Sequence, residues 1–362
     1  MKFANLLVNG RFMGLRPTGV QRFATEILRA VDEILEQEGG SVMVAVPPAI
    51  DAREVYRRMQ LIRPGRGNGH YWEQLHLART LPATTLLNLC NSAPMWRADQ
   101  IVTIHDAGVY DNPRSYSWRY RHWYRFMYAR LRRLDARIVT VSQFSRKRLA
   151  TCLDLPEATI AVVPQGGDHL LRVPADSSVL DRHGIDAQRY VLTVGSRARH
   201  KNFASLGLLG RELALAGMDL VVVGGVDAGV FAEVSQAGLP PGAKYVGHVT
   251  DAELRALYEN AVMFVFASRY EGFGLPPLEA LMVGCPVAVS PCGALPDVCG
   301  RDAVYIRPDS PEDIAEKVMR FVGGPARQVE APVSDRIKRF TWKSAARALL
   351  AVVRERQTED VL

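Results

Sequence analysis

YVLTV at residues 190–194 is an apolar run without polar alternation, and LVVV at residues 220–223 is another, with a helix-like segment between them. Such runs are typical of parallel strands that are buried on both faces of a sheet. We expect further strands at 244–246, 263–266 and 286–289, and helices at 204–216, 251–260, 277–283 and 311–322. The second half of the chain therefore predicts a parallel α/β sheet, which binds ligands at the carboxyl ends of its strands.

The first half of the chain shows the same kind of pattern less regularly. We expect strands at 3–8, 42–46, 101–104, 137–141 and 160–163, and helices at 19–37, within 115–134 and at 143–153. The sheet pattern is lost between residues 168 and 186, which carry loop residues. The fold class is therefore α/β, with two Rossmann-like, doubly wound parallel-sheet domains that face a cleft. We place the domains at 1–170 and 185–341, with a helix at 342–362 that crosses back to the first domain.

Composition narrows the class of protein. The chain has 362 residues, of which 48% are hydrophobic, so two domains can each bury a core. No apolar run approaches the ~20 residues that span a bilayer. The N-terminus lacks the layout of a signal peptide, and the five cysteines are odd in number and form no C-x-x-C pair. We expect a cytoplasmic protein, and we interpret the cysteines at 285, 292 and 299 as core residues rather than metal ligands.

The net charge of +7 indicates an anionic partner. A nucleoside diphosphate, anionic lipid headgroups and nucleic acid all satisfy this condition. Charge alone does not choose between them.

The most informative motif is RYEGFGLPPLEAL at residues 269–281. Glu271 falls in a glycine-rich loop after a strand, and Glu279 falls in the helix that begins around the two prolines. A helix that opens from a glycine loop offers backbone N–H groups and a positive dipole end to phosphate oxygens. Carboxylates beside it suit sugar hydroxyls, which donate hydrogen bonds. The motif predicts a site for a ligand with both phosphate and polyol parts.

This loop resembles that of the retaining glycosyltransferases of the GT-B type, family 4 (group 1), in particular bacterial mannosyltransferases of surface-polysaccharide biosynthesis. The resemblance covers nearly the whole chain, because further motifs follow in the expected order. It implies that Glu279 holds the ribose hydroxyls and that Glu271 contacts the donor sugar. It also implies that the backbone of Phe273, Gly274 and Leu275 touches the sugar and the diphosphate.

Two more segments of the second domain match the family. VGSRARHKN at 194–202 resembles the loop whose lysine binds the donor diphosphate, which implies that role for Lys201. The family often has arginine where this chain has His200, so either Arg197 or Arg199 supplies the second positive charge. YVGHVTDAEL at 245–254 resembles the segment beside the nucleotide base, and Gly247, His248 and Val249 would line that pocket.

The first domain carries two matching segments. TIHDA at 103–107 places His105 at the carboxyl end of a strand, and the resemblance implies that this histidine meets the donor sugar near the reacting carbon. Asp106 either orients His105 or caps the following loop. RPTGVQR at 16–22 resembles the glycine loop that meets the diphosphate, with Gly19 as the match, and Arg22 either adds charge or faces solvent. We place Asp106 and Arg22 on the acceptor side.

No D-x-D occurs in the sequence, so the metal clamp of the other large glycosyltransferase fold is missing. We therefore expect no metal and no cofactor, the nucleotide sugar being a substrate. The leaving diphosphate would be stabilised by Lys201, arginines and backbone amides.

Residues 114–137 are rich in arginine and aromatic side chains, with Asp135 the only acid. One interpretation is a helix with Trp118, Tyr124, Met127 and Leu131 inward and arginines outward. The alternatives are contact with a membrane or lipid-linked acceptor, and stacking on nucleic-acid bases.

Taken together, the sequence predicts a retaining, metal-independent glycosyltransferase. The first candidate donor is GDP-mannose, and the expected acceptor is a hydroxyl of a glycan or a polyprenyl-linked saccharide, with no nucleic-acid partner. The location is cytoplasmic, with peripheral contact at the inner face of a membrane as an option. The rival hypotheses are a nucleotide-sugar epimerase on the same fold and a basic nucleic-acid-binding protein.

Overall fold

The structure is a computed structural model that describes residues 5–15, 18–51, 56–224, 240–324 and 333–359. The chain divides into two compact units. The first unit comprises Met1–Tyr110, Arg121–Gln165 and Thr341–Leu362, and the second unit comprises Asp111–Tyr120 and Gly166–Phe340. The C-terminal segment thus returns to the unit in which the chain begins.

The first unit is built on a parallel sheet of seven strands in the order β3-β2-β1-β4-β5-β6-β7. This is the Rossmann order extended by one strand, and the order reverses between β1 and β4. The strands are β1 Leu6–Asn9, β2 Val42–Ala45, β3 Met59–Ile62, β4 Thr85–Asn88, β5 Gln100–Thr103, β6 Arg137–Thr140 and β7 Ile160–Val162. The central strands β1, β4 and β5 are buried throughout, as their apolar runs require.

Two strands of this sheet were not predicted. β3 lies at the edge of the sheet, and its partly exposed MQLI sequence gives no buried run. β4 is central and buried, but the two leucines of its TLLN sequence lie between polar Thr85 and Asn88, so no longer apolar run marks the strand. The strand expected at 3–8 begins at Leu6 among the described residues, and residues 3 and 4 lie outside them.

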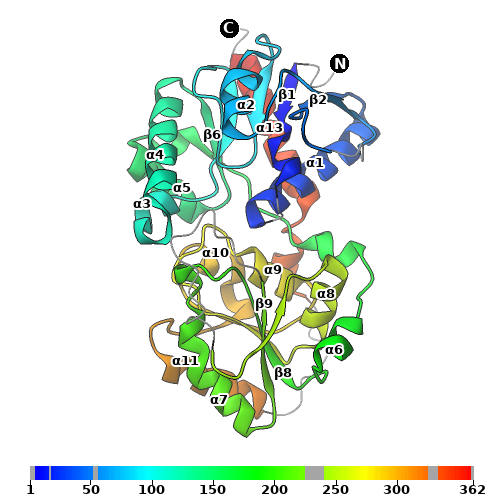
Figure 1. Ribbon diagram of the computed structural model, residues 1–362, viewed down its shortest axis with the longest axis vertical. Helices are drawn as coiled ribbons and strands as arrows, with labels where there is room; N and C mark the ends of the chain where they lie inside the picture. The colour runs from blue at the N-terminus through cyan, green and yellow to red at the C-terminus, as the bar shows by residue number, and fades with distance from the viewer. Residues whose placement is uncertain (1–4, 16–17, 52–55, 225–239, 325–332, 360–362) are drawn as a thin grey trace. The chain divides into compact units, whose positions relative to one another are not determined.

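The helices of the first unit pack around this sheet. They are α1 Gly19–Glu38, α2 Gly69–Leu75, α5 Gln143–Leu153, α13 Trp342–Glu359, most of α4 Trp118–Arg133 and most of the single turn α3 Gly108–Asp111 after β5. α1 begins with a capping box in which the Thr18 backbone N–H donates to Gln21 Oε1 (3.2 Å). α1 and α13 lie side by side, and the rings of Phe23 and Trp342 meet edge to face 6.1 Å apart (Figure 1).

The helix α4 differs from its expected packing at one position. Tyr124, Met127 and Leu131 are buried, as the inward face of the helix requires. Trp118 was expected on the same face but is 63% exposed, because it is the first residue of the helix and no helical turn precedes it for its side chain to pack on. Its ring is instead approached by the Arg119 guanidinium, 5.7 Å from the centroid.

The second unit is built on a six-stranded parallel sheet in the Rossmann order β10-β9-β8-β11-β12-β13. Its strands are β8 Tyr190–Val194, β9 Asp219–Val223, β10 Lys244–Gly247, β11 Met263–Phe266, β12 Val287–Val289 and β13 Ala303–Tyr305. β13 was not predicted, since its three residues are only partly buried at the sheet edge. The order reverses between β8 and β11, so a ligand site is expected where these two strands end.

The helices of the second unit are α6 Ser178–His183, α7 Gly207–Leu215, α8 Asp251–Asn260, α9 Leu275–Met282, α10 Leu295–Cys299, α11 Pro311–Val322 and α12 Asp335–Lys338. α7 and α11 lie side by side and cover one face of the sheet (Figure 1). Leu209, Leu213, Ile314 and Val318 of these helices form a core with the strands. The helix predicted from residue 204 begins at Gly207, because residues 203–206 form a 3₁₀ turn.

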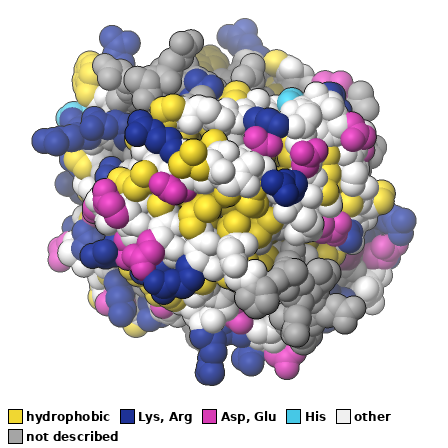
Figure 2. All heavy atoms as spheres, turned by 90° about the horizontal axis from the view of Figure 1, so that it is seen from below, with side chains coloured by type: hydrophobic (Ala, Val, Ile, Leu, Met, Phe, Trp, Pro, Cys, Tyr) yellow, Lys and Arg dark blue, Asp and Glu magenta, His cyan; other side chains and the backbone are white. Residues whose placement is uncertain are grey.

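The surface carries charges of both signs. On the face shown in Figure 2, hydrophobic side chains gather near the middle, and both basic and acidic side chains surround them. This face therefore lacks the track of a single charge sign that a nucleic-acid backbone requires. None of the helices described here combines the length and the apolarity needed to cross a membrane.

Candidate active site

The loops after β8 and β11 bring Lys201 and Glu271 together at the reversal point of the second sheet. Lys201 ends the 3₁₀ turn η6 (Arg199–Lys201), and its Nζ lies 2.8 Å from Glu271 Oε1. The same Nζ is 5.0 Å from the centroid of the Phe266 ring in β11. Asn202 fixes this loop, because its Nδ2 donates to the carbonyls of Ala267 (3.1 Å) and Pro308 (2.7 Å). A cation and a carboxylate are thus held in contact at the place where parallel sheets bind ligands.

The glycine loop after β11 is held by the loop that follows the next strand, β12. The backbone N–H of Ala294 donates to the Glu271 carbonyl (3.0 Å), so the backbone at Glu271 is held from outside its own loop. Gly274 caps α9 with φ +100°, and a Cβ built on it would lie 2.4 Å from Leu295 Cδ2. The position therefore requires glycine, both for its backbone conformation and for space.

The start of α9 corrects one expectation about backbone amides. α9 begins at Leu275, and Pro276 and Pro277 follow in its first turn. Proline has no N–H, so the first turn offers fewer donors than an ordinary helix N-terminus. The amides available for a diphosphate are those of Leu275 and the loop before it. The Phe273 side chain packs inward on Phe340, with ring centroids 5.9 Å apart, so only its backbone can serve the site.

Glu279, one turn further along α9, is almost fully buried, and each carboxylate oxygen has a side-chain neighbour. The Tyr258 hydroxyl donates to Oε2 (3.2 Å), and His169 Nε2 lies 3.1 Å from Oε1. Burial and the Glu279 carboxylate raise the pKa of Tyr258 well above its ordinary value, so this hydroxyl stays a donor. Neither partner could be predicted from the sequence, since a lone histidine after Asp168 and a tyrosine inside a helix give no signal.

The segment expected beside the nucleotide base lies at the end of β10. The Gly224 N–H donates to the Gly247 carbonyl (2.9 Å), which ties the end of β10 to the end of β9. A Cβ on Gly247 would meet no atom within 4 Å, so the space beside this residue is open. His248 is exposed and Val249 is partly exposed. All three residues are thus accessible, and their role beside the base stays a prediction.

The positive charges near Lys201 differ from one another. Arg197 stacks its guanidinium over the Tyr245 ring, 4.7 Å from the centroid, whereas Arg199 is exposed at the start of η6. Burial lowers the pKa of His200 to about 4, with the Lys201 charge acting in the same direction and Glu271 opposing it. His200 is therefore neutral at pH 7. It does not replace the charge of the arginine that the family often carries there.

In the first unit, His105 follows β5 and is buried. Its ring Nε2 lies 3.0 Å from the Leu89 carbonyl, which can only accept, so Nε2 carries the proton and Nδ1 the lone pair. Its backbone N–H donates to Asn91 Oδ1 (2.8 Å), and Phe23 meets the ring edge to face at 4.9 Å. Burial lowers the pKa of His105 to about 4, although the Leu89 hydrogen bond opposes the shift. At neutral pH this side chain is an uncharged imidazole with a fixed tautomer.

The other residues expected in this unit lie at helix starts. Asp106 Oδ1 accepts from the Gly108 N–H (2.6 Å) and so caps the turn α3, which is the capping alternative. Gly19 is the first residue of α1, and a Cβ there would meet nothing within 4 Å. Arg22 lies 3.7 Å from Glu26 Oε1 on the same helix. Residues 16 and 17 of the glycine-loop motif lie outside the described residues.

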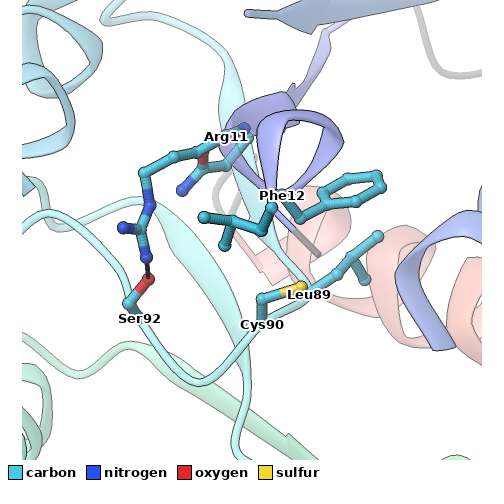
Figure 3. Close-up of a pocket in the computed structure, with 7 residues that line it drawn as sticks. Arg11, Phe12, Leu89, Cys90 and Ser92 are labelled. Carbon is cyan, nitrogen blue, oxygen red and sulfur yellow. Dashed lines mark hydrogen bonds between the residues drawn. The ribbon is translucent and has the colours of Figure 1, made fainter. Parts of the chain in front are cut away.

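A small pocket that the sequence analysis missed lies at the reversal point of the first sheet. It is lined by residues after β1 and β4, among them Arg11 in the 3₁₀ turn η1 (Gly10–Gly14). Figure 3 shows Arg11 reaching to Ser92, with Phe12, Leu89 and Cys90 beside it. Arg11 Nη2 donates to Ser92 Oγ (2.6 Å), and Nε lies 3.3 Å from the fully buried Glu73. Leu89 joins this pocket to His105 through its carbonyl.

The cysteines at 285, 292 and 299 were expected in the core. Cys285 and Cys299 are buried and Cys292 is partly buried, and none is in a disulfide. In the part of the chain that the structure describes, no group of three or more His, Cys, Asp or Glu side chains is arranged to hold a metal ion.

Comparison with known proteins identifies the family. The family "Glycosyltransferase Family 4" matches residues 17–169, and "Glycosyl transferases group 1" matches residues 180–334. O-antigen chain mannosyltransferase B of Escherichia coli is 29% identical over 259 residues, which is 67% of each chain. O-antigen chain mannosyltransferase RfbU of Salmonella typhimurium is 24% identical over 327 residues, covering 84% of this chain and 87% of the relative.

The fold agrees with this assignment. The sucrose-phosphate synthase of Thermosynechococcus elongatus superposes with a TM-score of 0.70 at 18% identity, covering 97% of this chain and 98% of that one. WaaG, a glycosyltransferase involved in lipopolysaccharide biosynthesis, superposes with a TM-score of 0.60 at 16% identity over 96% and 95% of the two chains. With two Rossmann-type sheets and both family matches, the chain belongs to the group 1 and family 4 glycosyltransferases, and it is a glycosyltransferase of the GT-B fold.

Proposed function

We propose that this glycosyltransferase moves a hexose, with mannose from GDP-mannose as the first candidate, onto a hydroxyl of a saccharide in polysaccharide biosynthesis. The transfer retains the anomeric configuration and uses no metal ion. Two relatives that are O-antigen mannosyltransferases support mannose as the sugar and a surface polysaccharide as the product class.

The observation that carries the proposal is the contact between Lys201 and Glu271 at the end of β11, with Glu279 on the helix that follows. Lys201 would bind the donor diphosphate, and Glu271 would accept hydrogen bonds from the sugar hydroxyls. Glu279 would accept from the ribose hydroxyls. Gly247, His248 and Val249 would border the base, and the amides of Gly274 and Leu275 would meet the diphosphate.

Stabilisation of the leaving group would come from this chain's own groups. As the bond to the anomeric carbon breaks, negative charge grows on the diphosphate, and the Lys201 ammonium and the loop amides oppose that charge. The neutral His105 would accept a hydrogen bond from a sugar hydroxyl at Nδ1, because its low pKa leaves it uncharged at pH 7 and its Nε2 proton is already donated to the Leu89 carbonyl. No strong nucleophile is required if the acceptor hydroxyl attacks from the face that the diphosphate leaves.

The acceptor would be a glycan or a polyprenyl-linked saccharide, met at the membrane surface. α4 contains seven arginine, lysine or histidine side chains among its 16 residues and no acid, and it exposes Trp118 and Phe126. Trp96 is also exposed, with the Arg130 guanidinium 5.1 Å from its ring centroid. Interleaved cations and aromatic rings suit anionic headgroups. The test is co-sedimentation with vesicles that contain 30% anionic lipid, which should carry the protein into the pellet. The double variant Trp96→Ala with Phe126→Ser should stay in the supernatant. If both proteins sediment with the vesicles to the same extent, the membrane contact is refuted.

The donor is tested by thermal unfolding in the presence of GDP, UDP, ADP and their sugars. GDP and GDP-mannose should raise the melting temperature, because a ligand that binds only the folded state stabilises it by mass action. Lys201→Ala and Glu279→Gln should reduce the rise, whereas Lys343→Ala, at a partly exposed lysine of the first unit, should not. If no nucleotide raises the melting temperature of the unsubstituted protein, the donor assignment fails.

Metal use and stereochemistry need separate measurements. Transfer from GDP-mannose should continue after dialysis against EDTA, and the ¹³C–¹H coupling of the product should show the α configuration of the donor. A loss of activity that Mn²⁺ or Mg²⁺ restores would refute the metal-independent part, and a β product would refute retention.

A further inference from the structure

The Glu279 carboxylate is held by a pair of buried side chains that come from two different elements. Tyr258 belongs to α8, and His169 belongs to the 3₁₀ turn η5 (Asp168–Arg172). Both are buried, and they approach different oxygens of the carboxylate. His169 Nε2 lies 3.1 Å from Oε1, so the ring contacts the carboxylate, although the geometry is not that of a full hydrogen bond. The two partners leave each oxygen a second lone pair for a ligand.

The turn η5 is itself fixed by α8. Arg255 of α8 donates through Nη1 to the carbonyls of Leu170 (3.5 Å), Leu171 (3.4 Å) and Val173 (2.8 Å) at the end of the turn. Its Nε also donates to Glu259 (2.6 Å), which keeps the guanidinium in place. One helix therefore supports Glu279 twice, directly through Tyr258 and indirectly through the turn that carries His169.

The start of η5 is pressed against α9, the helix that carries Glu279. The Gly167 N–H donates to the Phe340 carbonyl (2.9 Å), and a Cβ on Gly167 would lie 2.9 Å from Leu278 Cγ. A side chain at residue 167 would thus force η5 away from α9 and move His169 away from the carboxylate. The approach of His169 to Glu279 depends on the absence of a side chain there.

We propose that His169 is a positioning residue that orients the Glu279 carboxylate toward the ribose of the donor, so that the protein distinguishes ribonucleoside from deoxyribonucleoside diphosphates. This inference rests on the proposed role of Glu279. A carboxylate on a flexible two-carbon stem loses rotamer freedom when it binds a hydroxyl, and a buried neighbour that has already fixed it reduces this loss. His169 supplies that restraint at Oε1, and Tyr258 supplies it at Oε2.

The test compares the affinity for GDP with the affinity for 2′-deoxy-GDP by titration calorimetry on the full chain. The unsubstituted protein should bind GDP about tenfold more tightly, because a hydrogen bond to a charged group is lost in the deoxy form. His169→Ala should reduce this ratio to about two, while His169→Gln, which retains a polar side chain of similar reach against Oε1, should restore most of it. Leu171→Ala, an exposed position (47%) on the same turn, is the matched control and should keep the full ratio.

The outcomes separate this inference from the proposed function. If Glu279→Gln removes the preference for ribose and His169→Ala leaves it intact, His169 does not position the carboxylate and the inference is overturned. If His169→Ala weakens GDP and 2′-deoxy-GDP by the same factor, its role is structural and the inference is also overturned. If Glu279→Gln itself leaves the preference unchanged, the ribose role of Glu279 fails first and the inference falls with it.

Discussion

The contact between Lys201 and Glu271 leads to a prediction in which two substitutions act in opposite directions on GDP binding. The lysine that would bind the diphosphate is already paired, at 2.8 Å, with the carboxylate that would bind the sugar. GDP must therefore compete with Glu271 for Lys201. Glu271→Gln should tighten the binding of GDP and at the same time lower the rate of transfer from GDP-mannose, whereas Lys201→Ala should weaken GDP.

The expected change in GDP affinity follows from how far the Lys201–Glu271 pair is exposed to solvent. The two side chains are 15% and 11% exposed, between an exposed pair worth ~0–1 kcal/mol and a fully buried pair whose breakage costs ~3–5 kcal/mol. An intermediate value of about 1.5 kcal/mol corresponds to roughly tenfold in affinity. We expect GDP to bind about tenfold more tightly to Glu271→Gln and at least tenfold more weakly to Lys201→Ala.

The assay is titration calorimetry with GDP at 25 °C, with transfer from GDP-mannose measured in parallel. Asp309→Asn is the matched control, because it breaks the exposed pair between Arg269 and Asp309 next to the same loop. That variant should bind GDP as the unsubstituted protein does. If Glu271→Gln weakens GDP as strongly as Lys201→Ala does, the pair does not compete with the diphosphate and the reasoning is refuted.

Three further predictions concern stability. The pKa of His105 is about 4 in the folded protein against 6.5 ordinarily, so the unfolded chain takes up the proton first as the pH falls, and stability drops by about 3 kcal/mol in total between pH 6.5 and 4. In urea unfolding, the loss of stability between pH 7 and 4.5 should be smaller in His105→Gln than in the unsubstituted protein. An equal loss in both proteins would contradict this. Glu73→Gln should cost roughly 2–4 kcal/mol in the same assay, because it leaves the partly buried Arg11 without its counter-charge; a loss below 0.5 kcal/mol would show that the pair is not needed. Gly274→Ala should lower the melting temperature more than Gly184→Ala, because both glycines have positive φ but only at Gly274 would the added Cβ meet another atom, Leu295 Cδ2. Equal decreases would mean that the loop before α9 adjusts to the added Cβ without cost.

Much of the fold could be predicted because buried parallel strands leave apolar runs without alternation. The runs at β8, β9 and β11 and at β5 and β6 are of this kind, and the structure has strands at each. The edge strands β3 and β13 were not predicted, because both are partly exposed and so lack an unbroken apolar run. The central β4 was also not predicted, because its two leucines lie between the polar residues Thr85 and Asn88 and form no longer apolar run.

Some residues of the candidate site could likewise be named from the sequence, and others could not. The glutamates of the RYEGFGLPPLEAL motif and Lys201 could be named from the sequence, because the loop at a strand end and the helix start are local features. Their roles remain predictions. The restraint on Glu279 could not be named, since His169 and Tyr258 lie 110 and 21 residues away along the chain.

What the sequence determined by itself is the class of sheet and the chemistry of the loops that follow its strands, because both depend on residues close together in the chain. Only the tertiary structure decided which charges meet. It paired Lys201 with Glu271, made His105 and His200 neutral by burying them, and placed His169 against Glu279. The physical reason is that burial and ion pairing depend on what the folded chain brings near each group, and no local pattern of residues records that.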